Sequence, residues 1–234
     1  MLALLAILAP NAHAWEGRTD DLGQQLHWAQ HTIRFQINPS GDHGLSESAV
    51  DTLVAAATRG WTHPVSGALR FKHDGTTPVN QASHTDAINA IYFEDNWTQD
   101  PDLLAVTYIW SNTEGEIIGF DMALNAEFHS WAIDGSDEAN DLLNTLSHEF
   151  GHALGIDHSA SETLATMYPT APPGEILKRD LHADDVAAIT HLYADADHAE
   201  EDPASCSTSG QSPTPLVLFF LSPLIAVHRR RKHS

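Results

Sequence analysis

The spacing of apolar residues along the chain predicts a mixed body of strands and helices. Residues 32–38 alternate and are rich in β-branched and aromatic side chains, which is typical of a strand. Residues 46–59 carry apolar side chains at helical spacing, and Ser46 is placed to cap their first turn. Further strands are predicted at 68–73, 87–94, 103–110 and 116–124.

Two later segments have helical spacing. Residues 137–154 predict a helix whose buried side holds Leu142, Leu143, Leu146, Phe150 and Leu154. The acidic residues near its start suit the positive end of the helix dipole; they are Asp137, Glu138 and Asp141. A final helix is predicted at 183–193, and the whole order indicates a layered α and β structure.

The N-terminal end has the pattern of a processing signal. A short apolar run at 2–9 is followed by Ala12, His13 and Ala14, which match an A-x-A cleavage site. We therefore interpret residues 1–14 as a signal peptide, with a mature chain that begins at Trp15. The alternative is an ordinary buried N-terminal segment.

The C-terminal end differs in composition from the body. Residues 195–215 predict a flexible polar linker that contains Cys206, and residues 216–234 combine an apolar run with a basic end. The apolar run at 216–227 is shorter than the roughly 20 residues of a spanning helix, and Pro223 interrupts it. The layout resembles the sorting tails called MYXO-CTERM, which implies processing by sorting machinery and surface display. The alternative is a short membrane anchor.

Charge and cysteine content narrow the function classes. The formal net charge is −21, from 32 acidic and 11 basic residues, and such a surface repels phosphate backbones. We therefore expect no nucleic-acid partner and interpret the acidity as a solvated surface, with bound Ca²⁺ as the less favoured alternative. A single cysteine allows no intrachain disulfide.

One eleven-residue stretch carries the candidate chemistry. His148 and His152 lie four residues apart, so they share a helix face and can direct ring nitrogens at one metal ion. Glu149 is rotated by about 100° around the axis, so its carboxylate can reach a metal-bound water without ligating the metal. Gly155 tolerates positive φ and predicts the helix end, after which His158 returns as a third ligand. Three protein ligands leave a position for water, as in catalytic zinc sites.

Two other interpretations of these residues stay open. The stretch could be a surface helix in a chain with 16 histidines. It could also be a zinc site that has lost its activity.

The stretch resembles the zinc signature of the metzincin peptidases, and Met167 lies where that family places its Met-turn. Ser159 and the sequence at 167–169 resemble the matrixin branch, the matrix-metalloproteinase type. Pro169 stands where other metzincin branches have a tyrosine near the metal, so Tyr168 is not carried over as a ligand. Residues 119–125 resemble the strand before the zinc helix in bacterial matrixin-like proteins, and residues 181–186 and 192–193 resemble the closing matrixin helix. The resemblance thus covers about 27–194.

The resemblance implies an α+β, zincin-like fold, with a twisted, mostly parallel sheet of about five strands, an active-site helix and a C-terminal helix. It also implies a catalytic domain at 15–194 with one catalytic Zn²⁺ and support from Met167. Its activity would be peptide-bond hydrolysis, with Glu149 as the base that activates a zinc-bound water. Substrates would lie extended along the edge strand near 103–111.

Some matrixin features are missing. Matrixin propeptides keep the enzyme latent through a cysteine that binds the zinc. The only cysteine here follows the domain, so latency is either absent or achieved in another way. The structural-zinc histidines and calcium loop are not recognisable. His84 and Asp86 have ligand-like spacing but precede the wrong strand, and His129 is interpreted as a surface or core residue. The pocket-wall tyrosine is absent from 170–173, which puts the family's usual specificity in doubt.

We therefore expect an exported, monomeric zinc endopeptidase that is secreted or displayed through its tail. Its partners would be protein or peptide substrates of the extracellular space or cell surface, and the membrane or sorting machinery for the tail. The alternative function is a surface-displayed binding or adhesion module that retains a zinc site without proteolytic activity.

Overall fold

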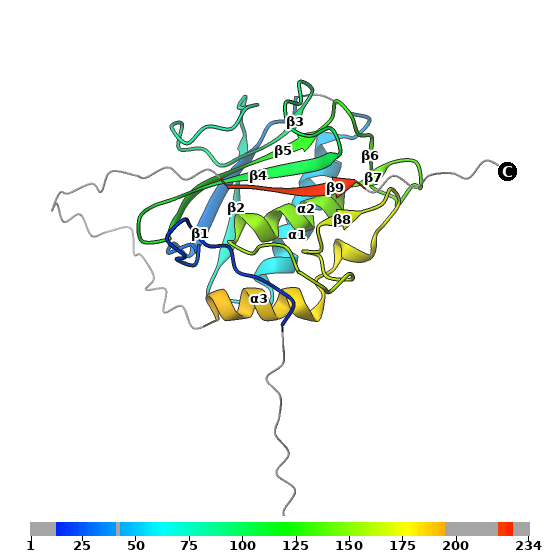
Figure 1. Cartoon of the computed structure of the whole chain (residues 1–234). Coiled ribbons are helices and arrows are strands. Elements are labelled where there is room, and N and C mark those ends of the chain that lie inside the picture. Colours follow the sequence, from blue (N-terminus) through cyan, green and yellow to red (C-terminus); the bar gives the residue numbers. More distant parts are fainter. Residues whose placement is uncertain (1–12, 41–42, 195–219, 227–234) are drawn as a thin grey trace, which may run out of the picture.

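The computed structural model describes residues 13–40, 43–194 and 220–226, and its elements are arranged around one large sheet (Figure 1). The helices are α1 (Glu47–Thr62), α2 (Leu142–Ala153), α3 (Ala183–Tyr193) and the short 3-10 helix η1 (Leu177–Arg179). The strands are β1 (Thr32–Ile37), β2 (Arg70–Thr76), β3 (Ala90–Glu94), β4 (Leu103–Ser111), β5 (Ile117–Asn125), β6 (Trp131–Ala132), β7 (Asn140–Asp141), β8 (Thr170–Ala171) and β9 (Phe220–Ala226).

The large sheet has the order β2-β1-β3-β5-β4-β9-β8. Strands β2, β1, β3 and β5 pair in parallel, and β4 pairs antiparallel with β5. These five strands, together with the three helices, confirm the predicted α+β fold and its mostly parallel sheet. Strand β9 was not predicted, because its residues were interpreted as part of the sorting segment.

The helices cover one face of this sheet, with α1 and α2 directly beneath it and α3 farther away (Figure 1). The aromatic rings of Phe35, Phe71, Phe120 and Phe150 pack edge-to-face between the sheet and α2. A second, smaller cluster on the other face includes Tyr92, Val106, Tyr108 and Trp110. Strand β4 is thus buried on both faces, and its side chains contribute to both clusters.

Local caps explain where the helices begin. Ser46 caps α1 as predicted, through a bond from the Ala49 N–H to its hydroxyl. The predicted start of the active-site helix at Asp137 was wrong, because α2 begins at Leu142 and the Asp141 side chain caps it. Residues 137–139 instead form a turn before β7, so only Asp141 lies at the positive end of the helix.

The N-terminal part of the described chain runs along the loop that follows α2. The N–H of Arg18 donates to Gly155 O at 2.8 Å, and the N–H of Asp157 donates to Glu16 O at 2.8 Å. The indole N–H of Trp28 donates to Ala153 O at 2.7 Å. These bonds fix the end of α2 and the bend after it.

Several predictions concern residues outside the described ranges. They are the signal peptide up to residue 12, the linker at 195–215 with Cys206, and the segment at 216–234 apart from β9. Within the described residues, no helix is both long enough and apolar enough to cross a membrane.

Candidate metal centre and active site

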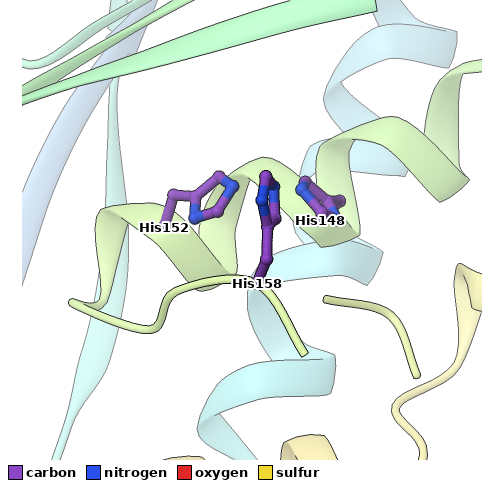
Figure 2. A group of neighbouring side chains, drawn as sticks. All are labelled: His148, His152 and His158. Carbon is purple, nitrogen blue, oxygen red and sulfur yellow. The ribbon is translucent and has the colours of Figure 1, made fainter. Parts of the chain in front are cut away.

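Helix α2 and the bend after it bring three imidazole rings together (Figure 2). The candidate ligand nitrogens of His148, His152 and His158 all lie within 4.8 Å of one another. The rings of His148 and His152 are buried, and that of His158 is partly buried. The bend depends on Gly155, which has φ of +81°, and a Cβ there would lie 2.3 Å from the Leu26 carbonyl oxygen.

Backbone carbonyls orient two of the rings. His148 Nδ1 lies 2.7 Å from Thr166 O, and His152 Nδ1 lies 2.9 Å from Ile156 O. A carbonyl oxygen can only accept, so each Nδ1 carries the proton and each Nε2 presents a lone pair.

The Nε2 atoms of all three rings are buried and have no hydrogen-bond partner among the described residues. Buried polar atoms normally have partners, so this arrangement needs an explanation. Three converging lone pairs fit a zinc ion, which takes imidazole nitrogens and leaves a further position open when it is catalytic.

Burial also sets the protonation state that metal binding requires. Burial lowers the pKa of His148 and of His152 well below the ordinary value, and the neighbouring histidines add to this effect. The pKa of His158 is lowered by burial, while the Asp157 charge opposes and the Arg18 charge assists this change. The rings are therefore neutral at pH 7, and a neutral imidazole is the form that binds metals.

The carboxylate of Glu149 is fixed from the sheet side. Thr107 on β4 donates its hydroxyl to Glu149 Oε2 at 2.6 Å, and both residues are fully buried. The buried Arg18 interacts electrostatically with this carboxylate. Burial lowers the pKa of its guanidinium, and the charges of Asp157 and Glu149 oppose this change by a smaller amount. The Thr107 hydroxyl also lies 3.3 Å from the Glu149 backbone oxygen, and its shorter bond to Oε2 favours one orientation of the carboxylate.

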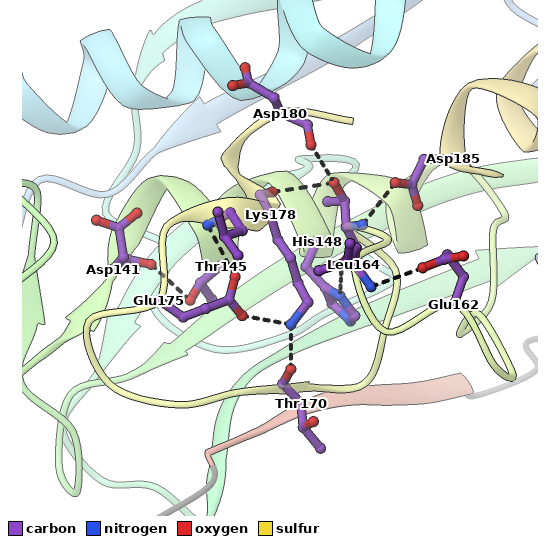
Figure 3. A network of polar contacts seen from close by, with 12 residues as sticks. Asp141, Thr145, His148, Glu162, Leu164, Thr170, Glu175, Lys178, Asp180 and Asp185 are labelled. Carbon is purple, nitrogen blue, oxygen red and sulfur yellow. Dashed lines mark hydrogen bonds and ion pairs between the residues drawn. The ribbon is translucent and has the colours of Figure 1, made fainter. Parts of the chain in front are cut away.

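Helix α3 supports the other side of the centre through the segment around Met167. Asp185 accepts the N–H groups of Thr166 at 2.8 Å and Met167 at 3.1 Å, and Thr166 O is the acceptor for His148. Figure 3 shows Asp185 and His148 in this network of polar contacts. Met167 is fully buried, and its sulfur would lie 2.2 Å from a Cβ at Gly151. The segment thus packs directly beneath α2, as a Met-turn would.

Other residues singled out in the sequence lie elsewhere. Within the described ranges, the three histidines are the one group of His, Cys, Asp and Glu side chains placed to share a metal, and neither His84 nor Asp86 belongs to it. His129 contacts Pro101 O through Nε2 at 2.9 Å. Tyr168 lines an open pocket of about 270 Å³ together with Thr170 of β8.

The sequence did not reveal Thr107, Asp185 or Arg18 as parts of the site. Thr107 lies 42 positions before Glu149, and nothing in the alternation of β4 distinguishes it from a core residue. Asp185 was visible only as part of the resemblance of the final helix. Arg18 lies close to the predicted signal-peptide cleavage site, and the sequence pattern there indicates only processing of the chain.

Comparisons with known proteins agree with this geometry. Residues 27–194 match the Matrixin family. Matrix metalloproteinase-26 of Homo sapiens is 27% identical over 174 residues, which cover 72% of this chain and 60% of that protein. Human matrilysin is 37% identical over 166 residues, covering 71% of this chain and 58% of that protein. Karilysin of Tannerella forsythia is 42% identical over 64 residues, covering 27% of this chain and 12% of that protein.

The chain therefore spans about 60% of the length of the human relatives over which it aligns broadly. The family match covers most of the described body, and it includes the helix and the bend that bring the three histidines together. By its sequence and its fold, this chain belongs to the matrixin family of zinc metallopeptidases.

Proposed function

We propose that this protein is a zinc-dependent endopeptidase that hydrolyses peptide bonds of extracellular or cell-surface proteins, with Glu149 as its general base. The observation that carries the proposal is the convergence of three buried, neutral imidazoles beside a carboxylate held by Thr107. A binding module would not need a buried carboxylate fixed in orientation beside the ligands.

The proposed roles follow from the positions of the side chains. His148, His152 and His158 would hold the metal, and Met167 would support them from below. Bound zinc would act as a Lewis acid and would lower the pKa of water to about 7. Glu149 would accept a proton from the attacking water at its carboxylate and then deliver it to the leaving amine nitrogen. Thr107 would keep that carboxylate in one orientation.

The substrate would bind as an extended strand beside β4. Peptides that extend a sheet gain main-chain hydrogen bonds along its edge, and their alternate side chains enter pockets. The substrate would lie in a slot between β4 and β8, since β8 is on the other side of this position in the sheet. Strand β8 consists of Thr170 and Ala171, and this segment lacks the tyrosine that forms a pocket wall in the family. We therefore expect a substrate preference that differs from that of the human relatives.

The change Glu149→Gln tests the proposal. Glutamine keeps the shape of the side chain and an oxygen that can accept from Thr107, but it is a very weak base. We expect kcat on a quenched fluorescent peptide to fall about 10²- to 10⁴-fold, with zinc content and thermal stability unchanged. A zinc-loaded Glu149→Gln variant with wild-type turnover would contradict the role of Glu149.

The same preparation separates the proposal from the adhesion alternative. The full chain should cleave casein or members of a peptide library, and a zinc chelator should abolish this cleavage. A folded, zinc-loaded chain that cleaves no peptide would favour the binding module. Export and display through the C-terminal tail remain part of the proposal, and cell fractionation of the tagged chain tests them.

A further inference from the structure

The slot between β4 and β8 is filled by the chain's own segment β9. Phe220–Ala226 pairs antiparallel with β4 from Leu103 to Ile109, and it pairs in parallel with Thr170–Ala171 of β8 (Figure 1). These are the two strands between which the proposed substrate would bind. The family match ends at residue 194, so β9 lies outside the part of the chain that the family shares.

The direction of the backbone N–H groups shows that β4 is open to a partner on this edge. Phe120 of β5 lies opposite Ile109, but it donates its N–H to Asn89 Oδ1, away from β4. Ile109 must therefore direct its own N–H away from β5, and so must Thr107, two residues along the strand. Both N–H groups face β9.

The sequence of β9 suits this register. Pro223 lies opposite Val106, and a proline can occupy only a position that gives no ladder hydrogen bond. The N–H of Ser222, opposite Thr107, is then the group that pairs with the edge of β4. Thr107 thus meets β9 through its backbone, while its hydroxyl holds Glu149.

We infer that the segment 220–226 is an intramolecular competitor that occupies the substrate slot for most of the time and raises the KM for substrates while the tail is attached. This inference rests on the proposed function and deepens it. An extended chain between β4 and β8 excludes a second one, because each edge N–H and C=O group can pair with one neighbour only. The tether of 25 residues at 195–219 keeps the segment close to the slot, so its effective concentration is high.

The same residues cannot serve two partners at once. The apolar run at 216–227 contains β9, so capture of the tail by a membrane or by sorting machinery would withdraw the strand from the slot. Activation would then accompany delivery to the cell surface. Such a device would regulate the peptidase without a cysteine ligand on the metal.

The change Ser222→Pro in the full chain tests the inference, with Ser222→Ala as the matched control. Proline removes the N–H that pairs with Thr107, whereas alanine keeps it. If the tail fills the slot about nine-tenths of the time, KM for a fluorescent peptide should fall about tenfold in Ser222→Pro while kcat stays the same. A synthetic peptide of residues 219–227 should inhibit this variant competitively and restore the higher KM.

Hydrogen exchange gives a readout that does not need activity. The amides of Thr107 and Ile109 should exchange faster in Ser222→Pro than in wild type or Ser222→Ala, and amides of β1 and β3 should not change. This measurement can use a Glu149→Gln background. Suppose that exchange at β4 is faster in Ser222→Pro but that no protein with an intact Glu149 hydrolyses peptides. That result would contradict the proposed function and still support the pairing of β9 with β4.

Three results would overturn the inference. Equal KM and equal β4 exchange in all three proteins would show that β9 does not compete for the slot. Cleavage of the wild-type chain within 220–226, detected by mass spectrometry, would make the segment a substrate instead of a stable competitor. A KM that rises with protein concentration would assign the occupying strand to a second copy of the chain.

Discussion

The hydroxyl of Thr107 offers the sharpest test of how the sheet serves the site. It donates to Glu149 Oε2 at 2.6 Å, and both residues are fully buried. The change Thr107→Val removes the hydroxyl but keeps the branched shape, and valine is favoured in strands. The fold and the histidine cluster should therefore be retained, while the carboxylate loses the bond that fixes its orientation.

The size of the effect follows from the charge on the acceptor. A hydrogen bond to a charged group contributes about 1.5–3 kcal/mol, and about 1.4 kcal/mol corresponds to a tenfold change in rate. If the whole contribution acts on the chemical step, kcat of Thr107→Val should fall about 10- to 150-fold. KM should change little, since the Thr107 backbone and not its hydroxyl faces the substrate slot.

The assay is steady-state hydrolysis of a quenched fluorescent peptide, with zinc content and thermal denaturation measured on the same samples. Thr107→Ser is the matched control, because serine keeps the donor and loses only a methyl group. Its kcat should lie close to that of wild type, which a purely structural role of the side chain would not predict. A zinc-loaded Thr107→Val protein with kcat within about twofold of wild type would refute the reasoning.

Two further predictions concern stability. Gly151→Ala places a Cβ 2.2 Å from the Met167 sulfur and 2.7 Å from Trp61. We therefore expect the free energy of unfolding, measured by denaturant titration, to fall by about 1–3 kcal/mol. Gly60→Ala is the control and should cause no loss, because a Cβ there has no atom within 4 Å. Burial raises the pKa of Asp121 to about 7, so the folded state holds this proton at pH values where the unfolded chain has released it. Stability from this group should fall as pH rises from about 4 to about 7, by up to about 1.4 kcal/mol per pH unit, and Asp121→Asn should remove that slope.

Latency built from a C-terminal strand differs physically from a ligand that occupies the metal. A cysteine switch blocks the reaction by coordination, whereas β9 would block it by taking the hydrogen-bonding edge of β4. Removal of the strand would leave the metal centre and Glu149 unchanged. The two modes therefore have different kinetic signatures, with a change in KM for the strand and a change in kcat for the ligand.

The sequence by itself determined the features that depend on short separations. Helical geometry fixes the relation of His148 to His152, and a glycine that tolerates positive φ allows the bend to His158. The cap of α1 and the bounds of α3 likewise follow from neighbouring residues. A layered structure of strands and helices could be predicted because long periodic segments indicate which side chains are buried, whereas the α+β, zincin-like class was implied by the family resemblance.

Only the tertiary structure decided which distant groups meet. Asp141 caps α2 while Arg179 binds its carboxylate, and the helix therefore starts later than its apolar spacing suggests. Thr107 reaches Glu149 because the pairing of β4 with β5 sets which face its side chain takes. Likewise, β9 completes the sheet because the open edge of β4 can pair with an extended segment from any position in the chain. Such contacts depend on the register of strand pairing and on which distant segments of the chain come together. The spacing of neighbouring residues encodes neither of these.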